Sequence, residues 1–382
     1  MYGLNMNKIR SLSIFLCVIL MLGCNSNNNG GAGLPQQDTA CTDQQLEELE
    51  QSMTDTLTST LTDTDFTLIL ESDDGRSYSV STGASTSSTL YESASTSKLV
   101  TAVVILSLID QGTTPLTLDS KPQDFISFWT PTAGTPASRI TLRHLLSFTS
   151  GFMTEPDAVP PALLGCIDRS LGNFKGCVEE IYNTNINNNI EPGSQYYYSG
   201  SHLQIAGLMA INAGDYSNWT AVFNDFKIRT GLFSHSTYDL PSLSNPRLAG
   251  GMHWTGDDYH AFLRALYSGQ ILSAGMRAEL WDDQRGAATV ENSPIVNAMG
   301  EDWGYAFGNW IECRNPTFDC GTSLQRNSCP GAYGAYPFID FENKYFGILS
   351  RQGAIGTFQN GINLFRTVEP TAKKWATRSC GT

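Results

Sequence analysis

Ser95 and Lys98 stand three residues apart in the tetrad Ser95-Thr96-Ser97-Lys98, a spacing that suits nucleophilic catalysis. A serine hydroxyl attacks a carbonyl efficiently only when a neighbouring base takes its proton. Residues three positions apart on a helix lie on the same face, so the lysine amine can reach the serine hydroxyl. The tetrad alone is weak evidence, because the chain contains 37 serines and eight lysines.

The segment that follows the tetrad is the most apolar helix candidate in the chain. Residues 98–111 are apolar nearly all the way round and stop at Gly112, which predicts a buried central helix. Ser95 would then lie at the helix N-terminus, where backbone N–H groups can stabilise a developing oxyanion. Burial would favour the neutral amine of Lys98 and let it act as a base.

Amphipathic and alternating segments surround this central helix. A capping box at residues 42–45 precedes apolar residues spaced by three and four, which predicts an N-terminal helix. Residues 66–71 and 76–81 flank Asp73-Asp74-Gly75 and predict a β-hairpin. Further strands are predicted at residues 305–311, 333–340 and 345–350, and a C-terminal helix bent by Pro370 at residues 361–378.

Strands near both ends of the chain, with helices between them, predict one sheet domain interrupted by a helical one. The sheet domain would comprise residues 41–112 and 295–382, and the helical subdomain residues 113–294. The chain shows no internal repeat.

Four segments resemble the group formed by class C β-lactamases, penicillin-binding proteins and family VIII esterases. The tetrad and its helix resemble the nucleophile helix of that group, and residues 140–151 (ITLRHLLSFTSG) closely match its TLRHLLTHTSG signature. Residues 192–200 are similar to its PG…YSN segment, and residues 248–258 to its AGGL…DL segment. The resemblance implies an α+β, β-lactamase/transpeptidase-like fold. In that fold an antiparallel sheet is flanked by the N- and C-terminal helices, and an all-helical subdomain is inserted.

By this resemblance, Tyr198 relays a proton between Ser95, Lys98 and the leaving group. The alternative is that Tyr198 only packs within the aromatic run of residues 196–198. Gly200 occupies a substrate-binding position where the β-lactamases carry Asn, and the loss of that amide counts against β-lactamase activity.

The third element of the family is a strand with Lys-Thr-Gly, and residues 329–334 (CPGAYG) are its best match here. Only the glycine, Gly331, is retained; it would permit a close backbone approach. The N–H of Ala332 would complete an oxyanion hole with that of Ser95. Gly331 and Cys329 are therefore expected beside the substrate. The missing lysine favours an esterase.

Seven cysteines remain beyond residue 24, and in an exported protein they predict disulfides. Cys166 with Cys177 is the simplest local pair, and Cys41 with Cys380 could join the ends. One of Cys313, Cys320 and Cys329 must stay unpaired, and we expect Cys329 to be bonded to one of the other two. Because no Cys-x-x-Cys or metal-spaced histidine pair occurs, we expect no metal and no cofactor.

The N-terminal segment is typical of an export signal. Two basic residues precede the apolar run of residues 12–22, which is too short to cross a bilayer, so residues 1–23 are a predicted signal peptide. Met21-Leu22-Gly23-Cys24 resembles the bacterial lipobox, which implies lipidation of Cys24 and a lipid anchor; ordinary signal cleavage is the alternative. Residues 24–40 would be a flexible tether. We expect an exported protein, either an outer-membrane lipoprotein or a periplasmic one.

The chain is acidic, with a net charge of -14 and no run of basic residues, so nucleic acid is excluded as a partner. The leading hypothesis is a serine hydrolase that forms an acyl-enzyme on small ester or amide substrates. A β-lactamase, a D-alanyl-D-alanine carboxypeptidase and a catalytically inactive cell-wall-binding homologue are the alternatives. The oligomeric state stays open.

Overall fold

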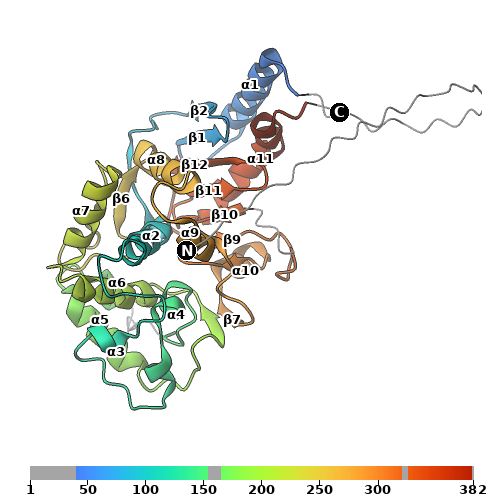
Figure 1. Cartoon of the computed structure of the whole chain (residues 1–382). Helices are drawn as coiled ribbons and strands as arrows, with labels where there is room; N and C mark the ends of the chain where they lie inside the picture. Colours follow the sequence, from blue (N-terminus) through green and yellow to red (C-terminus); the bar gives the residue numbers. More distant parts are fainter. Residues whose placement is uncertain (1–39, 154–164, 321–325, 381–382) are drawn as a thin grey trace, which may run out of the picture. The chain divides into compact units, whose positions relative to one another are not determined.

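The computed structural model describes residues 40–153, 165–320 and 326–380 (Figure 1). The predicted signal peptide, Cys24 and all but the last residue of the predicted tether lie outside the described residues. Within these ranges, no helix is long and apolar enough to cross a membrane.

The largest sheet in the described residues has seven antiparallel strands. Its strands follow the order β2-β1-β12-β11-β10-β9-β8, so the N-terminal hairpin pairs with a strand from near the C-terminus. The bounds are β1 Phe66–Ser72, β2 Ser77–Ser81, β8 Gly304–Tyr305, β9 Trp310–Ile311, β10 Arg326–Ser328, β11 Tyr336–Asp340 and β12 Tyr345–Arg351.

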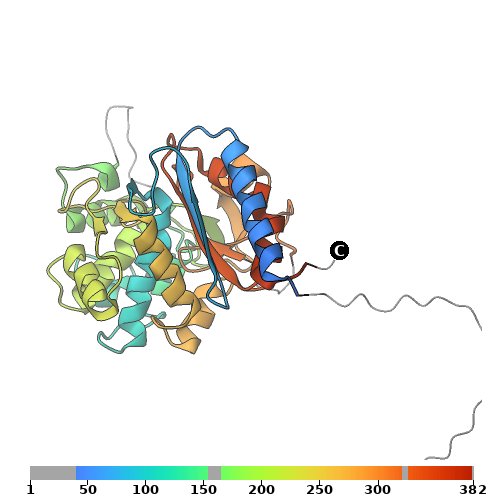
Figure 2. The same ribbon diagram turned by 90° about the horizontal axis from the view of Figure 1, so that it is seen from above.

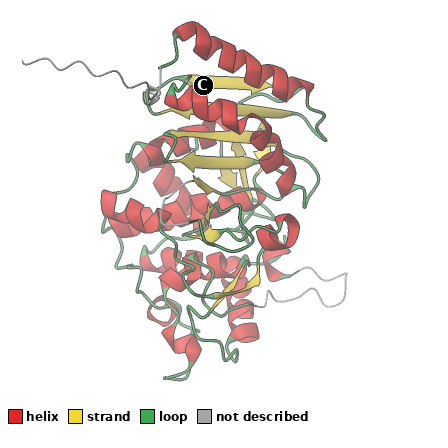
Figure 3. Ribbon diagram, turned by 90° about the vertical axis from the view of Figure 1, so that its right-hand side faces the viewer, coloured by secondary structure: helices red, strands yellow, loops and turns green. Residues whose placement is uncertain are grey.

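Helices cover both faces of this sheet (Figures 2 and 3). α1 (Asp43–Ser59) and α11 (Phe358–Thr377) lie together on one face, and α8 (Gly256–Tyr267) packs against β1, β11 and β12 on the other. Every residue of β1 and β12 is buried, because each strand is covered on both sides. The predicted hairpin, N-terminal helix with its capping box, and C-terminal helix containing Pro370 are confirmed.

α2 (Ser97–Asp110) is the buried helix between the sheet and the other helices, and a short 3₁₀ turn, η1 (Ala94–Thr96), leads into it. Every residue from Ser97 to Leu108 is buried. α2 contacts α6 (Ser201–Ala213), α7 (Trp219–Thr230) and α9 (Ala274–Trp281). A helix surrounded by protein needs an apolar surface all the way round, and that pattern predicted it from the sequence.

Residues 113–294 are mainly helical, but the expectation of an all-helical subdomain needs correction. β5 and β6 from this segment join β3 in a three-stranded sheet, and β4 pairs in parallel with β7. Strands of two to four residues are too short to give a periodic signal. The bounds are α3 Pro122–Phe125, α4 Leu142–Leu146, α5 Phe174–Asn185, α10 Pro294–Met299, β3 Leu90–Glu92, β4 Gln195–Tyr197, β5 Thr237–Tyr238, β6 Met252–Thr255, β7 Thr289–Asn292, η2 Pro136–Arg139 and η3 Cys166–Asp168.

The strand predicted at residues 305–311 is two short strands, β8 and β9, separated by a turn. Gly308 makes this turn with a φ of +70°. A Cβ atom on Gly308 would lie 2.5 Å from the carbonyl oxygen of Lys98. The turn therefore packs closely against the start of α2, and only glycine fits there without displacement.

Two other strand predictions also differ from the structure. β11 begins at Tyr336 rather than at residue 333, because residues 331–334 form a turn in which Gly334 N donates to Gly331 O over 2.8 Å. β10 was not predicted, since its three residues are polar. Arg326, buried in β10, is neutralised by Asp340 at 2.8 Å.

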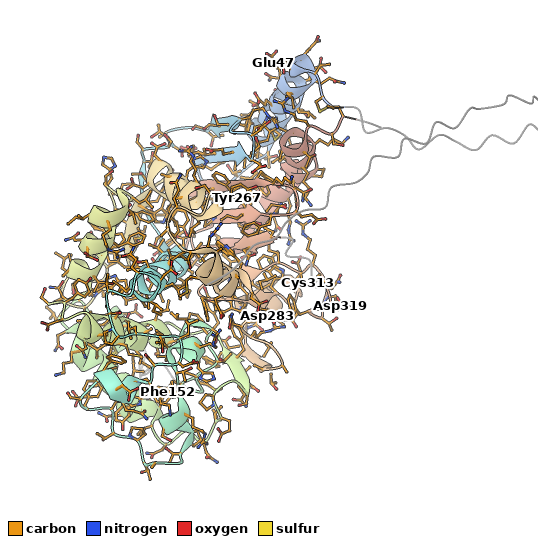
Figure 4. The ribbon with its side chains drawn as sticks, viewed as in Figure 1. Glu47, Phe152, Tyr267, Asp283, Cys313 and Asp319 are labelled. Atoms are coloured by element: carbon orange, nitrogen blue, oxygen red, sulfur yellow. A yellow bond between two sulfur atoms is a disulfide. The ribbon has the colours of Figure 1, made fainter. Side chains whose placement is uncertain are left out.

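Disulfides of the described chain join Cys41 to Cys380, Cys166 to Cys177 and Cys313 to Cys320. The first two confirm the sequence prediction. The expectation that Cys329 is bonded is wrong, because Cys313 and Cys320 pair locally and leave Cys329 as a buried thiol. Asp319 lies beside Cys313 and Cys320 (Figure 4). Both sulfur atoms are used by the disulfide, so this cluster does not constitute a metal site.

Candidate active site

Ser95 is the middle residue of η1, and the residues on either side of it fix its backbone. Ala94 has a φ of +44°, a left-handed conformation that is unfavourable for a residue with a Cβ atom. Thr96 is fixed by two aromatic donors: Trp254 Nε1 lies 2.8 Å from its hydroxyl, and the Tyr259 hydroxyl lies 2.9 Å from its carbonyl oxygen. Strained backbone held by buried hydrogen bonds is common at functional sites.

Lys98 is buried and its amine points at Ser95. Lys98 Nζ donates to Ser95 Oγ over 2.9 Å and to the carbonyl oxygen of Ala249 over 2.8 Å. The same Nζ lies 4.7 Å from the centre of the Tyr198 ring. The structure thus brings together the three residues that the sequence singled out, from two segments a hundred residues apart.

Tyr198 follows β4 and is fixed by main-chain and ring contacts. Its N–H donates to the carbonyl oxygen of Asn292 over 3.0 Å, and the Asn292 amide donates back to the Tyr198 carbonyl oxygen over 3.0 Å. The ring stacks on Trp310 at a centroid distance of 5.2 Å. Burial raises the pKa of the Tyr198 hydroxyl far above its usual value, although a hydrogen bond with the Ser95 side chain opposes the rise. Tyr198 therefore stays protonated at ordinary pH and can donate a proton.

Gly331 and Ala332 pass close to the N-terminus of α2. A Cβ atom on Gly331 would lie 2.7 Å from the carbonyl oxygen of Ser93, so the close approach expected from the sequence is present. The Ala332 carbonyl oxygen accepts a 2.8 Å hydrogen bond from Gly356 N, which anchors Ala332 without using its own N–H. Within the described ranges, the Ala332 N–H donates to no backbone carbonyl. It is available, with the N–H of Ser95, to a bound oxyanion.

Two cavities meet at Ser95, Tyr198 and Ala332. The first, which we call the polar cavity, has a volume of about 220 Å³ and is also lined by Lys98 and Gly200. The second, which we call the apolar cavity, measures about 250 Å³. Further lining residues of the polar cavity are Ala94, Ile167, Asp168, Ser199, Arg247, Ala249, Gly250, Tyr333 and Ile355, and those of the apolar cavity are Pro294, Ile295, Trp310, Pro330, Gly356 and Phe358.

Sequence reasoning missed several residues that line these cavities. Asp168 and Arg247 carry charges in the polar cavity, and Ile295 and Phe358 give the apolar cavity its character. Arg247 directly precedes the family-like segment at residues 248–251, which was the one available signal. The others lie in segments with no recognisable motif.

Cys329 and Gly331, expected to bind substrate, line neither cavity in the described structure. Cys329 lies behind the nucleophile candidate: its Sγ is 3.1 Å from the carbonyl oxygen of Ser95 and 3.3 Å from that of Gly308. Burial raises the pKa of the Cys329 thiol to about 11. Both residues therefore pack against the backbone around Ser95 and do not face the cavities. Cys329 does so as a neutral thiol.

The raised pKa predicts that Cys329 resists alkylation in the folded protein. Alkylation requires the thiolate, which a free cysteine forms near pH 8.5, but Cys329 stays protonated well above that pH and is buried. We expect iodoacetamide at pH 8 to leave Cys329 unmodified in the native protein and to modify it in guanidinium chloride without reductant. Peptide mass mapping measures the modified fraction of the peptide that contains Cys329. Rapid native modification would contradict the buried, neutral thiol.

No histidine is among the described residues that line the two cavities at Ser95. His202 stacks on Phe148 at 4.9 Å, contacts the Tyr197 carbonyl oxygen through Nε2, and has its pKa lowered to about 4 by burial. His253 Nδ1 lies 2.6 Å from an Asp239 carboxylate oxygen. The arrangement around Ser95 is therefore a serine–lysine–tyrosine cluster rather than a serine–histidine–aspartate triad.

An antiparallel sheet, a helical layer and a serine–lysine pair at the start of the helix between them are the arrangement of a serine hydrolase fold. The beta-lactamase family profile matches residues 67–354, and the chain belongs to that family. The resemblance drawn from the sequence is thereby confirmed, as is the predicted α+β, β-lactamase/transpeptidase-like fold, apart from the short strands found in the inserted segment.

Solved structures with the same fold differ widely in sequence from this chain. A beta-lactamase-like protein from Bacteroides dorei DSM 17855 is 23% identical, with a TM-score of 0.68 over 87% of this chain and 99% of its own. EstCE1, a hydrolase with promiscuous acyltransferase activity, is 17% identical, with a TM-score of 0.65 over 88% and 99%. A D-stereospecific amidohydrolase from Streptomyces sp. is 17% identical, with a TM-score of 0.58 over 83% and 97%. No curated protein sequence is significantly similar to this chain.

Proposed function

We propose that this protein hydrolyses small esters, and amides less readily, through an acyl-enzyme on Ser95. The observation that carries the proposal is the 2.9 Å contact between Lys98 Nζ and Ser95 Oγ at the point where the two cavities meet. A base in hydrogen-bond contact with a serine that opens to a cavity is the arrangement that nucleophilic catalysis requires.

In the acylation step, Ser95 Oγ bonds to the substrate carbonyl carbon while its proton passes to Lys98 Nζ. The oxyanion that forms accepts hydrogen bonds from the N–H groups of Ser95 and Ala332. When the tetrahedral intermediate collapses, the bond to the leaving oxygen breaks and the Tyr198 phenol gives its proton to that oxygen. Lys98 Nζ returns the Ser95 proton to Tyr198, so both groups recover their starting states. In deacylation, water attacks the acyl carbon and gives a proton to Lys98 Nζ. The bond to Ser95 Oγ then breaks, Ser95 Oγ takes up that proton, and the acid is released.

An ester preference is supported by what replaces the polar elements of the β-lactamases. Gly200 offers no side-chain amide to hold a substrate amide, and Cys329 provides a neutral thiol at the position of the family lysine. The apolar cavity, with Ile295, Trp310 and Phe358 in its wall, suits a hydrocarbon group. Among the similar structures, EstCE1 is a hydrolase with promiscuous acyltransferase activity and the Streptomyces protein is an amidohydrolase, so amide substrates are kept in the proposal as the slower class.

Covalent labelling tests the proposal directly. A fluorophosphonate should label the native protein on one peptide, with the adduct on Ser95, and heating before labelling should abolish the signal. A parallel panel of p-nitrophenyl esters, nitrocefin and a D-alanyl-D-alanine peptide should show turnover of the esters first. Failure of several acyl donors to label Ser95 would favour a catalytically inactive binding protein. Faster turnover of nitrocefin than of every ester would favour a β-lactamase.

We further propose that the protein is exported, as a lipoprotein anchored through Cys24 or as a periplasmic protein. The three disulfides support this location, because disulfides persist in oxidising compartments. The lipobox-like residues 21–24 support lipidation.

A further inference from the structure

Arg247 contributes a guanidinium group to the wall of the polar cavity that contains Ser95. Of the described residues that line the two cavities, Arg247 is the only arginine. Its Nη1 pairs with a carboxylate oxygen of Asp168, which lines the same cavity. Its Nε is buried and has no hydrogen-bond partner among the described residues. A ligand cannot reach this buried Nε, but the Arg247 side chain as a whole is 31% exposed. The ion pair uses Nη1 only in part, so the donors left for a ligand are those on the two Nη atoms of the planar fork.

The guanidinium group is adjacent to the nucleophile turn. A Cβ atom on Gly250 would lie 3.3 Å from Arg247 Nε and 3.5 Å from the carbonyl carbon and oxygen of Ala94, the residue before Ser95. Gly250 therefore lies between Arg247 Nε and the Ala94 backbone. Because it has no side chain, the two groups can approach each other closely. The guanidinium group and Ser95 line the same cavity, on either side of Gly250.

The polar cavity is much less acidic than the chain as a whole. The chain carries a net charge of -14. Asp168 is the one carboxylate among the described residues that line the cavity, and the Arg247 guanidinium balances it when Lys98 is the neutral base. An anion repelled by most of the surface would find a favourable position here, and low-dielectric walls strengthen that effect.

We propose that Arg247 binds a carboxylate of the substrate, so that the preferred substrates are esters that carry a carboxylate a short distance from the scissile bond. The inference rests on the proposed function, since it concerns the cavity around Ser95. Arginine holds a carboxylate through two parallel charge-assisted hydrogen bonds, which fix orientation as well as charge. The uncharged part of the substrate occupies the apolar cavity beyond Tyr198.

Asp168 has two opposing effects on this site. Its ion pair with Arg247 Nη1 orients the guanidinium group, which favours recognition. Its negative charge also repels a bound carboxylate and so limits affinity. Asp168→Asn keeps a hydrogen-bond acceptor for Arg247 and removes the charge, so the balance between the two effects can be measured.

Two matched pairs of esters test the inference on the full-length protein. In the first pair the carboxylate is on the leaving group: meta-butanoyloxybenzoate and its methyl ester. In the second it is on the acyl group: the mono-p-nitrophenyl ester of adipic acid and the corresponding methyl diester. The readout for each pair is the ratio of kcat/KM for the acid to kcat/KM for the neutral ester. The pair with the larger ratio identifies the side of the scissile bond that Arg247 contacts.

We expect Arg247→Gln to lower that ratio by roughly 10- to 100-fold in at least one pair, which is the range for a charge-assisted hydrogen bond. Arg247→Lys should retain part of the preference, because it keeps the charge without the fork, and Asp168→Asn should raise the ratio. The control is Arg139→Gln, which removes an exposed arginine, ion-paired with Glu191, that lines neither cavity.

The two proposals fail in different ways. If the wild-type protein hydrolyses acid and neutral esters and Arg247→Gln leaves both ratios unchanged, carboxylate recognition by Arg247 is overturned while the serine hydrolase stands. If the wild-type protein hydrolyses no ester and acquires no label on Ser95, the proposed function itself fails. Thermal unfolding of each variant separates loss of recognition from loss of fold, and Asp168→Asn provides a second test if Arg247→Gln is unstable.

Discussion

Lys98→Met is expected to lower kcat for ester hydrolysis by about 10³- to 10⁴-fold. Methionine is close to lysine in length and volume, so it fills the buried space without the amine. The variant loses the base that lies 2.9 Å from Ser95 Oγ and also leaves the Ala249 carbonyl oxygen without this donor. Ser95→Ala is expected to lower kcat at least as much, because no hydroxyl then remains to form the acyl-enzyme.

The double variant of Ser95→Ala and Lys98→Met should be no slower than Ser95→Ala alone. Groups that act in one step lose their combined effect when either is removed, so their free-energy changes do not add. Steady-state rates of the two single variants and the double variant show whether the two free-energy changes add. Additive losses would mean that Lys98 acts independently of Ser95 and would contradict its assignment as the base.

Lys227→Met provides a matched control for the lysine substitution. Lys227 Nζ also donates to a backbone carbonyl, that of Ser236 at 3.1 Å, and lies 5.7 Å from the centre of the Phe223 ring. It lies on α7 and lines neither cavity at Ser95. Lys227→Met removes a lysine hydrogen bond to a backbone carbonyl, as Lys98→Met does. It should nevertheless leave kcat within a factor of about two.

The parts of the site that could be predicted from the sequence are those with a local pattern. Ser95 and Lys98 are separated by one helical turn, and the helix that follows is apolar on every side because it is buried on every side. Tyr198 was found through a short family-like segment. Each of these signals extends over fewer than about 20 consecutive residues and does not depend on the fold.

The walls of the cavities could not be predicted in the same way. The apolar cavity combines Ile295, Trp310 and Phe358, which lie on α10, β9 and α11 and meet only when the sheet is assembled. The redox state of Cys329 was mispredicted for a related reason. Spacing leaves three pairings of Cys313, Cys320 and Cys329 open, and the choice depends on β10 and its neighbouring loop placing Cys329 against α2.

Gly331→Ala is expected to lower kcat by about 10²- to 10³-fold with little change in KM, the effect of losing one oxyanion-hole donor. The added Cβ atom would lie 2.7 Å from the Ser93 carbonyl oxygen and 3.1 Å from Thr96 Cγ2. Because backbone atoms cannot move aside as a flexible side chain does, the turn carrying Ala332 must shift away from Ser95. The N–H of Ala332 would then no longer point at the oxyanion position.

The control for Gly331→Ala is Gly275→Ala on α9, where an added Cβ atom meets no atom within 4 Å. That variant should keep both kcat and the melting temperature, or gain slightly in stability from the better helix former. Kinetics of the two variants on one p-nitrophenyl ester, together with near-ultraviolet circular dichroism, separate a displaced donor from a damaged fold. If folded Gly331→Ala kept the wild-type kcat, the oxyanion would have to be held by groups other than Ala332. The close packing of residues 331–332 against the nucleophile turn would then serve stability alone.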